Sequence, residues 1–248
     1  MLDMIGSITG MTAIAVNIVA ITTVLNLSLR RRLVVAGGFG AWVGLASGLA
    51  AAGALTFSPE QPAPLIGLLA GAPLIAAAVC WFFAPGFRQA LLALPTPLLI
   101  GLNSLRVLGF LFLMLAAVGR LSGPFPYSAG LGDVITGILA IPVARAAARG
   151  DFERVGLWNA FGALDLFAAI GLGLTSAQGS PLHLMGAGVG SQAMQFLPFA
   201  LVPTVLVPFY LIMHGVLAAQ LVERRRRRRQ APDGKPSGFG TSGESVAV

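Results

Sequence analysis

The chain has 248 residues, of which 56% are hydrophobic and only 10% are charged, and its mean hydropathy is +0.85. Soluble domains carry about 25% charged residues, so this composition excludes an ordinary water-soluble protein. The net charge of +7 does not indicate a nucleic-acid partner, because six of the sixteen basic residues form a single run, Arg224 to Arg229, without an aromatic platform beside it.

Seven apolar stretches follow one another along the chain. A helix needs about 20 apolar residues to cross the roughly 30 Å hydrocarbon core of a bilayer. Stretches of this kind occur at residues 5–29, 33–57, 64–84, 95–118, 127–146, 157–175 and 196–221. They predict an all-α membrane protein, a bundle of about seven transmembrane helices that forms one domain over residues 1–223. Residues 224–248 are predicted to be the basic run and a disordered cytoplasmic tail, because the tail is too polar to bury a core.

The distribution of arginine predicts the orientation, since short cytoplasmic loops retain positive charge. Thirteen arginines fall near one set of helix ends and only Arg120 falls near the other set. The thirteen are Arg30, Arg31, Arg32, Arg88, Arg145, Arg149, Arg154 and Arg224 to Arg229. The N-terminus is therefore expected outside and the C-terminus in the cytoplasm. Arginine strongly outnumbers lysine beside abundant Ala and Gly, a bias typical of GC-rich bacterial genomes, so a bacterial cytoplasmic (inner) membrane is expected.

The second stretch carries small residues every four positions, which places them on one helix face. They are Ala36, Gly40, Gly44, Gly48 and Ala52. Small residues let another backbone approach closely, so this face predicts either packing inside the bundle, the interpretation we favour, or the seam of a homodimer. In the last stretch Pro198, Pro203 and Pro208 each remove a backbone donor, which favours kinks and permits a hinge.

Three charged residues lie within the apolar stretches: Arg106, Asp133 and Asp165. A central Arg or Asp costs about 2.5 kcal/mol or more in a bilayer, so such residues normally face the bundle interior and have a partner. Helical spacing places further polar side chains on the same faces, and His214 lies in the last stretch. These additional candidates are Asn103, Thr136, Asn159 and His214. The seven residues together form the predicted intramembrane polar site.

Two interpretations of this site stay open. Arg106 pairs with Asp133 or with Asp165 and only fixes the helix register, or the residues surround a functional cavity. The second interpretation has support from charge, because one arginine cannot fully neutralise two aspartates, and a carboxylate without a partner can bind a proton or a cation. His214 is either a proton-exchange group or a hydrogen-bonded packing residue.

Several classes of function are disfavoured by composition. The only lysine, Lys235, lies in the tail, which argues against a retinal Schiff base, and the two histidines, His183 and His214, are predicted on opposite sides of the membrane. Cys80 is the only cysteine, so a thiolate metal cluster is excluded and neither a metal nor another cofactor is expected.

The favoured hypothesis is a small proton- or ion-coupled carrier, or a ligand-binding membrane protein, with a small-molecule or lipid ligand at the polar site. An intramembrane enzyme acting on a lipid or isoprenoid is a second hypothesis, less favoured than a nonenzymatic protein, and a noncatalytic assembly or scaffold protein is a third. The expected partners are the bilayer itself and anionic headgroups, which the run Arg224 to Arg229 would contact at the cytoplasmic face.

Overall fold

The protein is a bundle of helices. The computed structural model describes residues 1–57, 65–180, 182–185 and 188–230. Its elements are α1 (Leu2–Val24), α2 (Leu29–Ala51), α3 (Leu65–Phe83), α4 (Pro85–Leu92), α5 (Thr96–Leu102), η1 (Asn103–Gly109), α6 (Phe110–Ala117), α7 (Phe125–Ala148), α8 (Phe152–Ser176), η2 (Gln192–Gln195), η3 (Val202–Leu206) and α9 (Val207–Gln230). Within these residues there is no strand, and seven helical spans are long and apolar enough to cross a membrane. The predicted seven-span, all-α architecture is confirmed.

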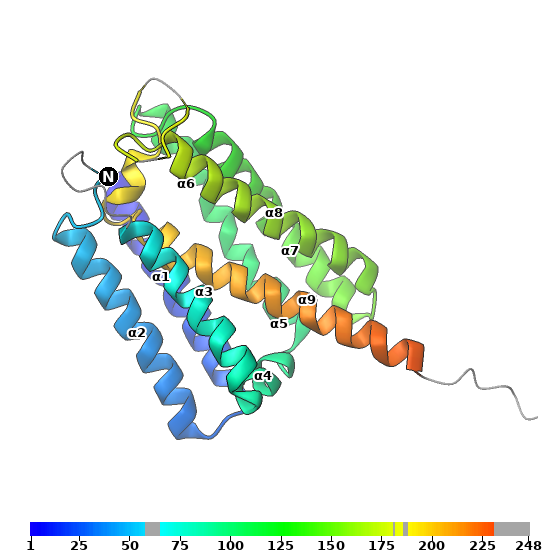
Figure 1. Cartoon of the computed structure of the whole chain (residues 1–248). Helices are drawn as coiled ribbons and strands as arrows, with labels where there is room; N and C mark the ends of the chain where they lie inside the picture. Colours follow the sequence, from blue (N-terminus) through cyan, green and yellow to red (C-terminus); the bar gives the residue numbers. More distant parts are fainter. Residues whose placement is uncertain (58–64, 181, 186–187, 231–248) are drawn as a thin grey trace, which may run out of the picture.

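The last helix, α9, lies between two groups of helices. On one side are α1, α2 and α3, and on the other are α7, α8 and the span made of α5, η1 and α6 (Figure 1). α7 packs most extensively, against α8 and against the α5–α6 span, while α3 packs against α4, α9 and η3. This arrangement brings the fourth, fifth, sixth and seventh spans together around the positions of the predicted polar site.

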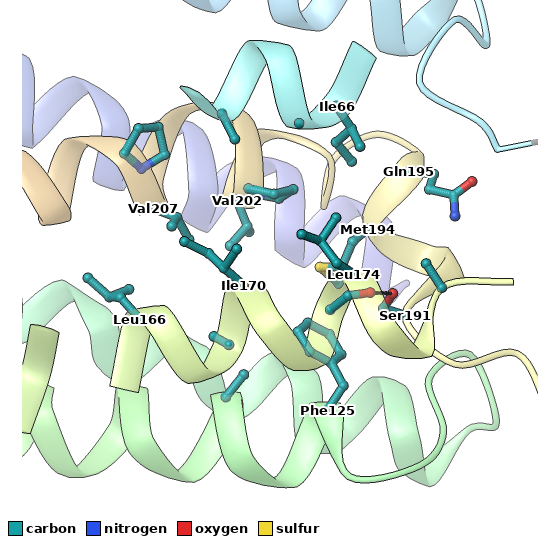
Figure 2. Close-up of a pocket in the computed structure, with 18 of the residues that line it drawn as sticks. Ile66, Phe125, Leu166, Ile170, Leu174, Ser191, Met194, Gln195, Val202 and Val207 are labelled. Carbon is teal, nitrogen blue, oxygen red and sulfur yellow. Dashed lines mark hydrogen bonds between the residues drawn. The ribbon is translucent and has the colours of Figure 1, made fainter. Parts of the chain in front are cut away.

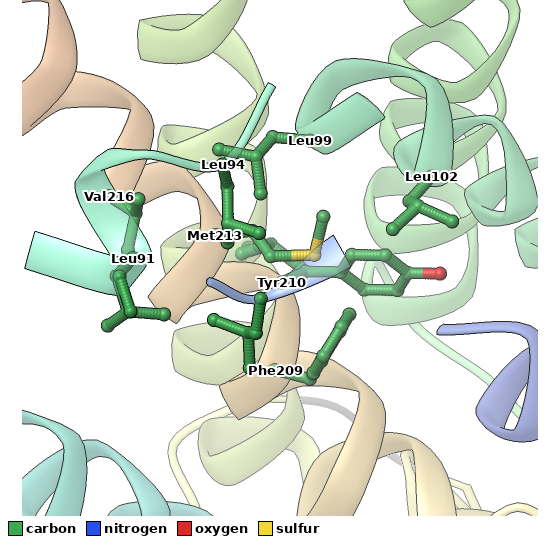
Figure 3. Packing of buried hydrophobic residues seen from close by; sticks show 11 residues of the cluster. Leu91, Leu94, Leu99, Leu102, Phe209, Tyr210, Met213 and Val216 are labelled. Carbon is green, nitrogen blue, oxygen red and sulfur yellow. The ribbon is translucent and has the colours of Figure 1, made fainter. Parts of the chain in front are cut away.

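A cluster of apolar side chains holds α4 and α5 against α9. Figure 3 shows Leu94 and Leu99 beside Met213 and Leu91 beside Val216, and all five are buried members of one cluster that also includes Phe209. Lipid tails are as apolar as these side chains, so the contact stabilises the bundle through close van der Waals packing more than through exclusion of water.

Two spans depart from α-helical geometry in the middle of the bundle. The fourth span becomes a 3₁₀-helix at η1, and the seventh begins with the π-helical turn η3. Pro208 has no N–H to offer the carbonyl of Thr204, four residues earlier, and this oxygen accepts a hydrogen bond from Trp42 Nε1 at 3.0 Å instead. The proline predicted to perturb the last span therefore does so, and α2 supplies the missing donor.

The basic run is helical and does not begin a separate region. α9 continues through Arg224 to Arg229 and ends at Gln230, because arginine is a good helix former and the run contains no helix breaker. The domain boundary predicted at residue 223 consequently falls inside a continuous helix. The predicted disordered tail after Gln230 lies outside the described residues.

The small-residue face of α2 does not pack inside the bundle, so the interpretation favoured from sequence is wrong. A Cβ added at Gly40, Gly44 or Gly48 would meet nothing within 4 Å. α2 instead buries the adjacent face, which carries Val43, Ala46 and Ala50, and Val43 and Ala46 pack in one cluster with Ile14, Leu201 and Val205. Contact of the small-residue face, which also includes Ala36 and Ala52, with a second copy of the chain stays a prediction.

The connection between α8 and α9 is anchored to the end of the bundle that holds the N-terminus (Figure 1). The Ser122 N–H donates to the Gly190 carbonyl at 3.0 Å, and the Gly190 N–H donates to Ser122 Oγ at 2.8 Å. At the same end the Phe57 N–H donates to Gln195 Oε1 at 3.0 Å. These bonds join the α2–α3, α6–α7 and α8–α9 connections into one surface.

Cysteine labelling tests the predicted orientation. In a Cys80→Ala background, Gln178→Cys places a thiol near the N-terminal end of the bundle and Arg228→Cys places one near the opposite end; both positions are exposed. We expect a membrane-impermeant maleimide to label Gln178→Cys in intact cells and Arg228→Cys only after permeabilisation, because arginine-rich ends stay in the cytoplasm. The reverse pattern would show that the orientation is inverted.

Candidate functional site

Arg106, in η1, forms ion pairs with both intramembrane aspartates at once. Its Nε donates to Asp133 Oδ1 at 2.6 Å, and its Nη2 donates to Asp165 Oδ2 at 2.5 Å. The Arg106 side chain is 1% exposed, whereas those of Asp133 and Asp165 are 16% and 7% exposed. Arg106 therefore pairs with both aspartates and not with one of them. Asp133 is the more accessible of the two.

The remaining face of the guanidinium is also occupied. Arg106 Nη1 lies 3.2 Å from the Gly162 carbonyl oxygen and 3.2 Å from His214 Nε2, and the Tyr210 ring lies with its centroid 5.9 Å from the guanidinium carbon. Four protein acceptors from three helices thus surround the arginine. This coordination holds α7, α8 and α9 against the fourth span.

The contacts of His214 determine its tautomer. A guanidinium only donates hydrogen bonds, so His214 Nε2 beside Arg106 must be an acceptor. Its proton then resides on Nδ1, which donates to Asn159 Oδ1 at 2.8 Å, and Asn159 Nδ2 donates in return to the His214 carbonyl at 3.3 Å. In this arrangement His214 is neutral, and both of its ring nitrogens have a hydrogen-bond partner.

The ion-paired group carries a net charge of −1 when both carboxylates are ionised. Each aspartate uses one oxygen on Arg106, and the second oxygens, Asp133 Oδ2 and Asp165 Oδ1, form no hydrogen bond within the described residues. Addition of one proton or one external cation would bring the charge to zero. A buried group with an uncompensated charge is costly, so this arrangement favours occupancy by such a cation.

Three glycines create the space for these charged side chains. A Cβ at Gly109 would collide with Asp133 Cβ, one at Gly132 would collide with the Asp165 carboxylate, and one at Gly162 would lie 2.7 Å from His214 Cε1. The backbones of η1, α7 and α8 therefore approach one another at the charged side chains. Gly109 and Gly132 are not conspicuous in the sequence, because glycine is common throughout the chain.

Two of the seven predicted site residues do not join the hydrogen-bonded network around Arg106. Asn103 Nδ2 donates to the Leu99 carbonyl on its own helix at 2.9 Å, and Thr136 Oγ1 is buried without a partner among the described residues. Neither side chain hydrogen-bonds to Arg106, Asp133 or Asp165 within the described residues. The other five, Arg106, Asp133, Asn159, Asp165 and His214, form one connected network.

An apolar cavity of about 260 Å³ adjoins this network. Its walls come from α3, α7, α8 and the last span, and Figure 2 shows Ile66, Leu166, Ile170 and Val202 pointing into it. The charged residue that lines it is Asp133. Phe125 also lines the cavity and lies eight positions before Asp133 in α7. At a rise of 1.5 Å per residue, the cavity therefore extends about 12 Å toward the N-terminal end of the bundle.

The far end of the cavity holds a second polar group. Gln195 is 2% exposed and lines the cavity (Figure 2); its Oε1 accepts from the Phe57 N–H, but its Nε2 has no partner within the described residues. A buried amide donor without a partner costs about 1–3 kcal/mol. The cavity therefore has a carboxylate acceptor at its inner end, an amide donor near its outer end and apolar walls between them.

A comparison with protein families gives one match. Residues 63–222 match a family described as a domain of unknown function, DUF8737. The match covers more than half of the chain. The protein belongs to the DUF8737 family. The DUF8737 region contains the ion-paired group, His214 and all of the cavity lining except Phe57, whereas α1 and α2 precede it. Neither a curated protein nor a solved structure matches the chain.

Helix α1, outside the DUF8737 region, nevertheless reaches the site. Asn17 is 1% exposed, and its Nδ2 donates to the Tyr210 hydroxyl at 3.2 Å, which in turn places the tyrosine ring beside Arg106. Sequence analysis missed both residues. No local pattern signals them, because they are 193 positions apart and meet only in the folded bundle.

Proposed function

We propose that the protein is a membrane carrier that exchanges a small lipophilic cation for a proton at Asp133. The observation that carries this proposal is the position of Asp133, which is bound to Arg106 and also lines the apolar cavity. A ligand with an apolar body would occupy the cavity, and its positive group would meet the accessible carboxylate.

The charge of the site supports a cation and argues against an anion. Arg106 is the arginine nearest the cavity, and its N–H groups are directed at Asp133, Asp165, Gly162 and His214. An anionic ligand would meet a carboxylate and no available guanidinium. Because either a proton or a ligand cation brings the ion-paired group to neutrality, the two compete for one site, which is the basis of exchange.

The two halves of the bundle differ in a way that supports transport. The cavity extends from Asp133 to the N-terminal end, whereas on the other side of Arg106 the interior is filled by a cluster that includes Ile100, Ala140 and Leu217. Alternating access requires that the open half close and the filled half open. The π segment η3 lines the cavity, and the 3₁₀ segment η1 carries Arg106, which binds Asp133; such segments often mark hinges.

The size of the cavity restricts the ligand. A volume of about 260 Å³ lies just below the usual range of small-molecule sites, about 300–1,000 Å³, and its length of about 12 Å favours an elongated molecule. The amide of Gln195 would bind a hydrogen-bond acceptor at the end remote from the positive group. The expected ligand class is therefore small amines or quaternary ammonium compounds with an apolar chain.

Exchange is measured in proteoliposomes that contain the pH indicator pyranine. The probe is n-hexyltrimethylammonium, a permanent cation that cannot itself carry a proton across the bilayer. We expect its addition outside to raise the internal pH, because inward movement of the cation releases a proton outward. Asp133→Asn should abolish the response while changing the free energy of unfolding by about 1 kcal/mol or less, since Arg106 and Asp165 then form a neutral pair.

Asp3→Asn is the matched control, because it removes a carboxylate that pairs with Arg120 at 2.6 Å at the N-terminal end of the bundle. It should leave exchange unchanged. An unaltered response in Asp133→Asn would refute the role of this residue. Saturable probe binding without any change in internal pH would refute transport and favour a ligand-binding membrane protein.

A further inference from the structure

A second candidate site lies at the opposite end of the bundle, between α4 and the last turns of α9. It is a surface groove of about 800 Å³. Its polar lining includes Arg88 and Gln89 of α4 with Arg226 and Arg227 of α9, and its apolar lining includes Trp81 and Val222. This groove is separate from the cavity at Asp133.

The packing of α4 presents Arg88 to the groove. Figure 3 shows Leu91 directed toward Val216 of α9, and both residues are buried. Arg88 lies one turn before Leu91 on this short helix and is exposed, and its guanidinium carbon lies 5.9 Å from the centroid of the Trp81 ring. Tryptophan is enriched at the level of lipid headgroups, so the groove has the composition of a membrane interface.

The charges of the groove are only partly compensated. Arg227 pairs with Glu223 at 2.6 Å. Arg88 and Arg226 form no ion pair within the described residues, which leaves two guanidinium groups facing the groove. Guanidinium groups bind phosphate oxygens through paired, charge-assisted hydrogen bonds.

The six arginines of the run are not equivalent. Arg226 and Arg227 line the groove, and Arg224 instead stacks over the Phe152 ring with its guanidinium carbon 4.2 Å from the ring centroid. Arg225 and Arg228 belong to the same helix but do not line the groove. The helix therefore places only some arginines of the run at the groove. If lipid were attracted by net charge alone, all six arginines would contribute equally.

We propose that this groove binds the headgroup phosphate of an anionic phospholipid, held between Arg88 and Arg226. The acyl chains would leave the groove along the apolar surface that Trp81 and Val222 begin. Its chemistry matches phosphatidylglycerol, an anionic headgroup joined to apolar chains. The site does not depend on the proposed carrier function.

The test compares two double variants of the full-length protein that lose the same charge. Native mass spectrometry measures how much phosphatidylglycerol and phosphatidylcholine the detergent-solubilised protein retains after incubation with an equal mixture. The wild type should prefer phosphatidylglycerol. Arg88→Gln with Arg226→Gln should reduce its retention about tenfold or more, because a charge-assisted hydrogen bond between a guanidinium group and the phosphate contributes about a factor of ten to affinity. The control, Arg225→Gln with Arg228→Gln, should reduce retention less than twofold, because these two arginines do not line the groove.

Folding is checked by the unfolding temperature, which should be unchanged in both variants because all four side chains are exposed. If the two double variants lose equal amounts of retained phosphatidylglycerol, the proposal is overturned in favour of attraction by net charge. No preference of the wild type for phosphatidylglycerol would also overturn it. Displacement of the lipid by millimolar inorganic phosphate would show that the groove binds free phosphate and not a lipid headgroup.

Discussion

Replacement of Arg106 by methionine is expected to lower the free energy of unfolding by about 3–5 kcal/mol. The variant leaves the buried carboxylates of Asp133 and Asp165 beside one another without the guanidinium that binds both. It also removes the donors to the Gly162 carbonyl and to His214 Nε2. The measurement is the unfolding of detergent-solubilised protein by dodecyl sulfate, followed by circular dichroism.

Arg120→Met is the matched control, since Arg120 also pairs with an aspartate at 2.6 Å but its side chain is 36% exposed. Arg120→Met is expected to lower the free energy of unfolding by about 1 kcal/mol or less, because solvent screens an exposed ion pair. If Arg106→Met lowers the free energy of unfolding no more than Arg120→Met does, the buried ion pairs do not hold the bundle together.

A triple variant separates the structural role of the ion pairs from their role in exchange. Arg106→Met combined with Asp133→Asn and Asp165→Asn removes all three charges and keeps the approximate shape of the side chains. We expect it to recover most of the stability lost in Arg106→Met, because replacement of a whole buried ionic group is tolerated better than removal of one partner. Proton exchange should stay absent, and its recovery would exclude the aspartates as exchange groups.

Gly132→Ala is expected to destabilise the protein by about 1–3 kcal/mol, even though alanine favours a helix more than glycine does by about 1 kcal/mol. The added methyl group would occupy the position of the Asp165 carboxylate. Either α7 and α8 move apart or Asp165 leaves Arg106, so exchange of the probe should also be impaired. The same dodecyl sulfate titration measures the loss of stability.

Gly44→Ala controls for helix propensity. It makes the same chemical change at a helical position where a Cβ meets nothing within 4 Å, so its effect should be neutral or slightly stabilising. A Gly132→Ala variant as stable as Gly44→Ala would mean that the close contact of Gly132 with Asp165 does not constrain the fold.

Hydropathy alone predicts the seven spans because lipid imposes a strict local rule, namely that each span must satisfy its own backbone hydrogen bonds over about 20 apolar residues. The same rule makes Arg106, Asp133 and Asp165 conspicuous, since a charge in an apolar segment requires a partner. Local rules fail where the partner is distant. The glycine ladder at Gly40, Gly44 and Gly48 satisfies a packing pattern, yet its face is open because neighbouring helices pack elsewhere.

Hydropathy and charge along the chain predict a bundle of membrane-spanning helices with three costly charges inside it. The folded bundle is needed to show that one arginine binds both aspartates, which are 27 and 59 positions away, and that Asp133 also lines an apolar cavity. The free-energy cost of burying a charged side chain depends on the residue type, so it can be judged from the local sequence. The partners that offset this cost depend on which helix faces meet, and that choice results from packing of the whole bundle.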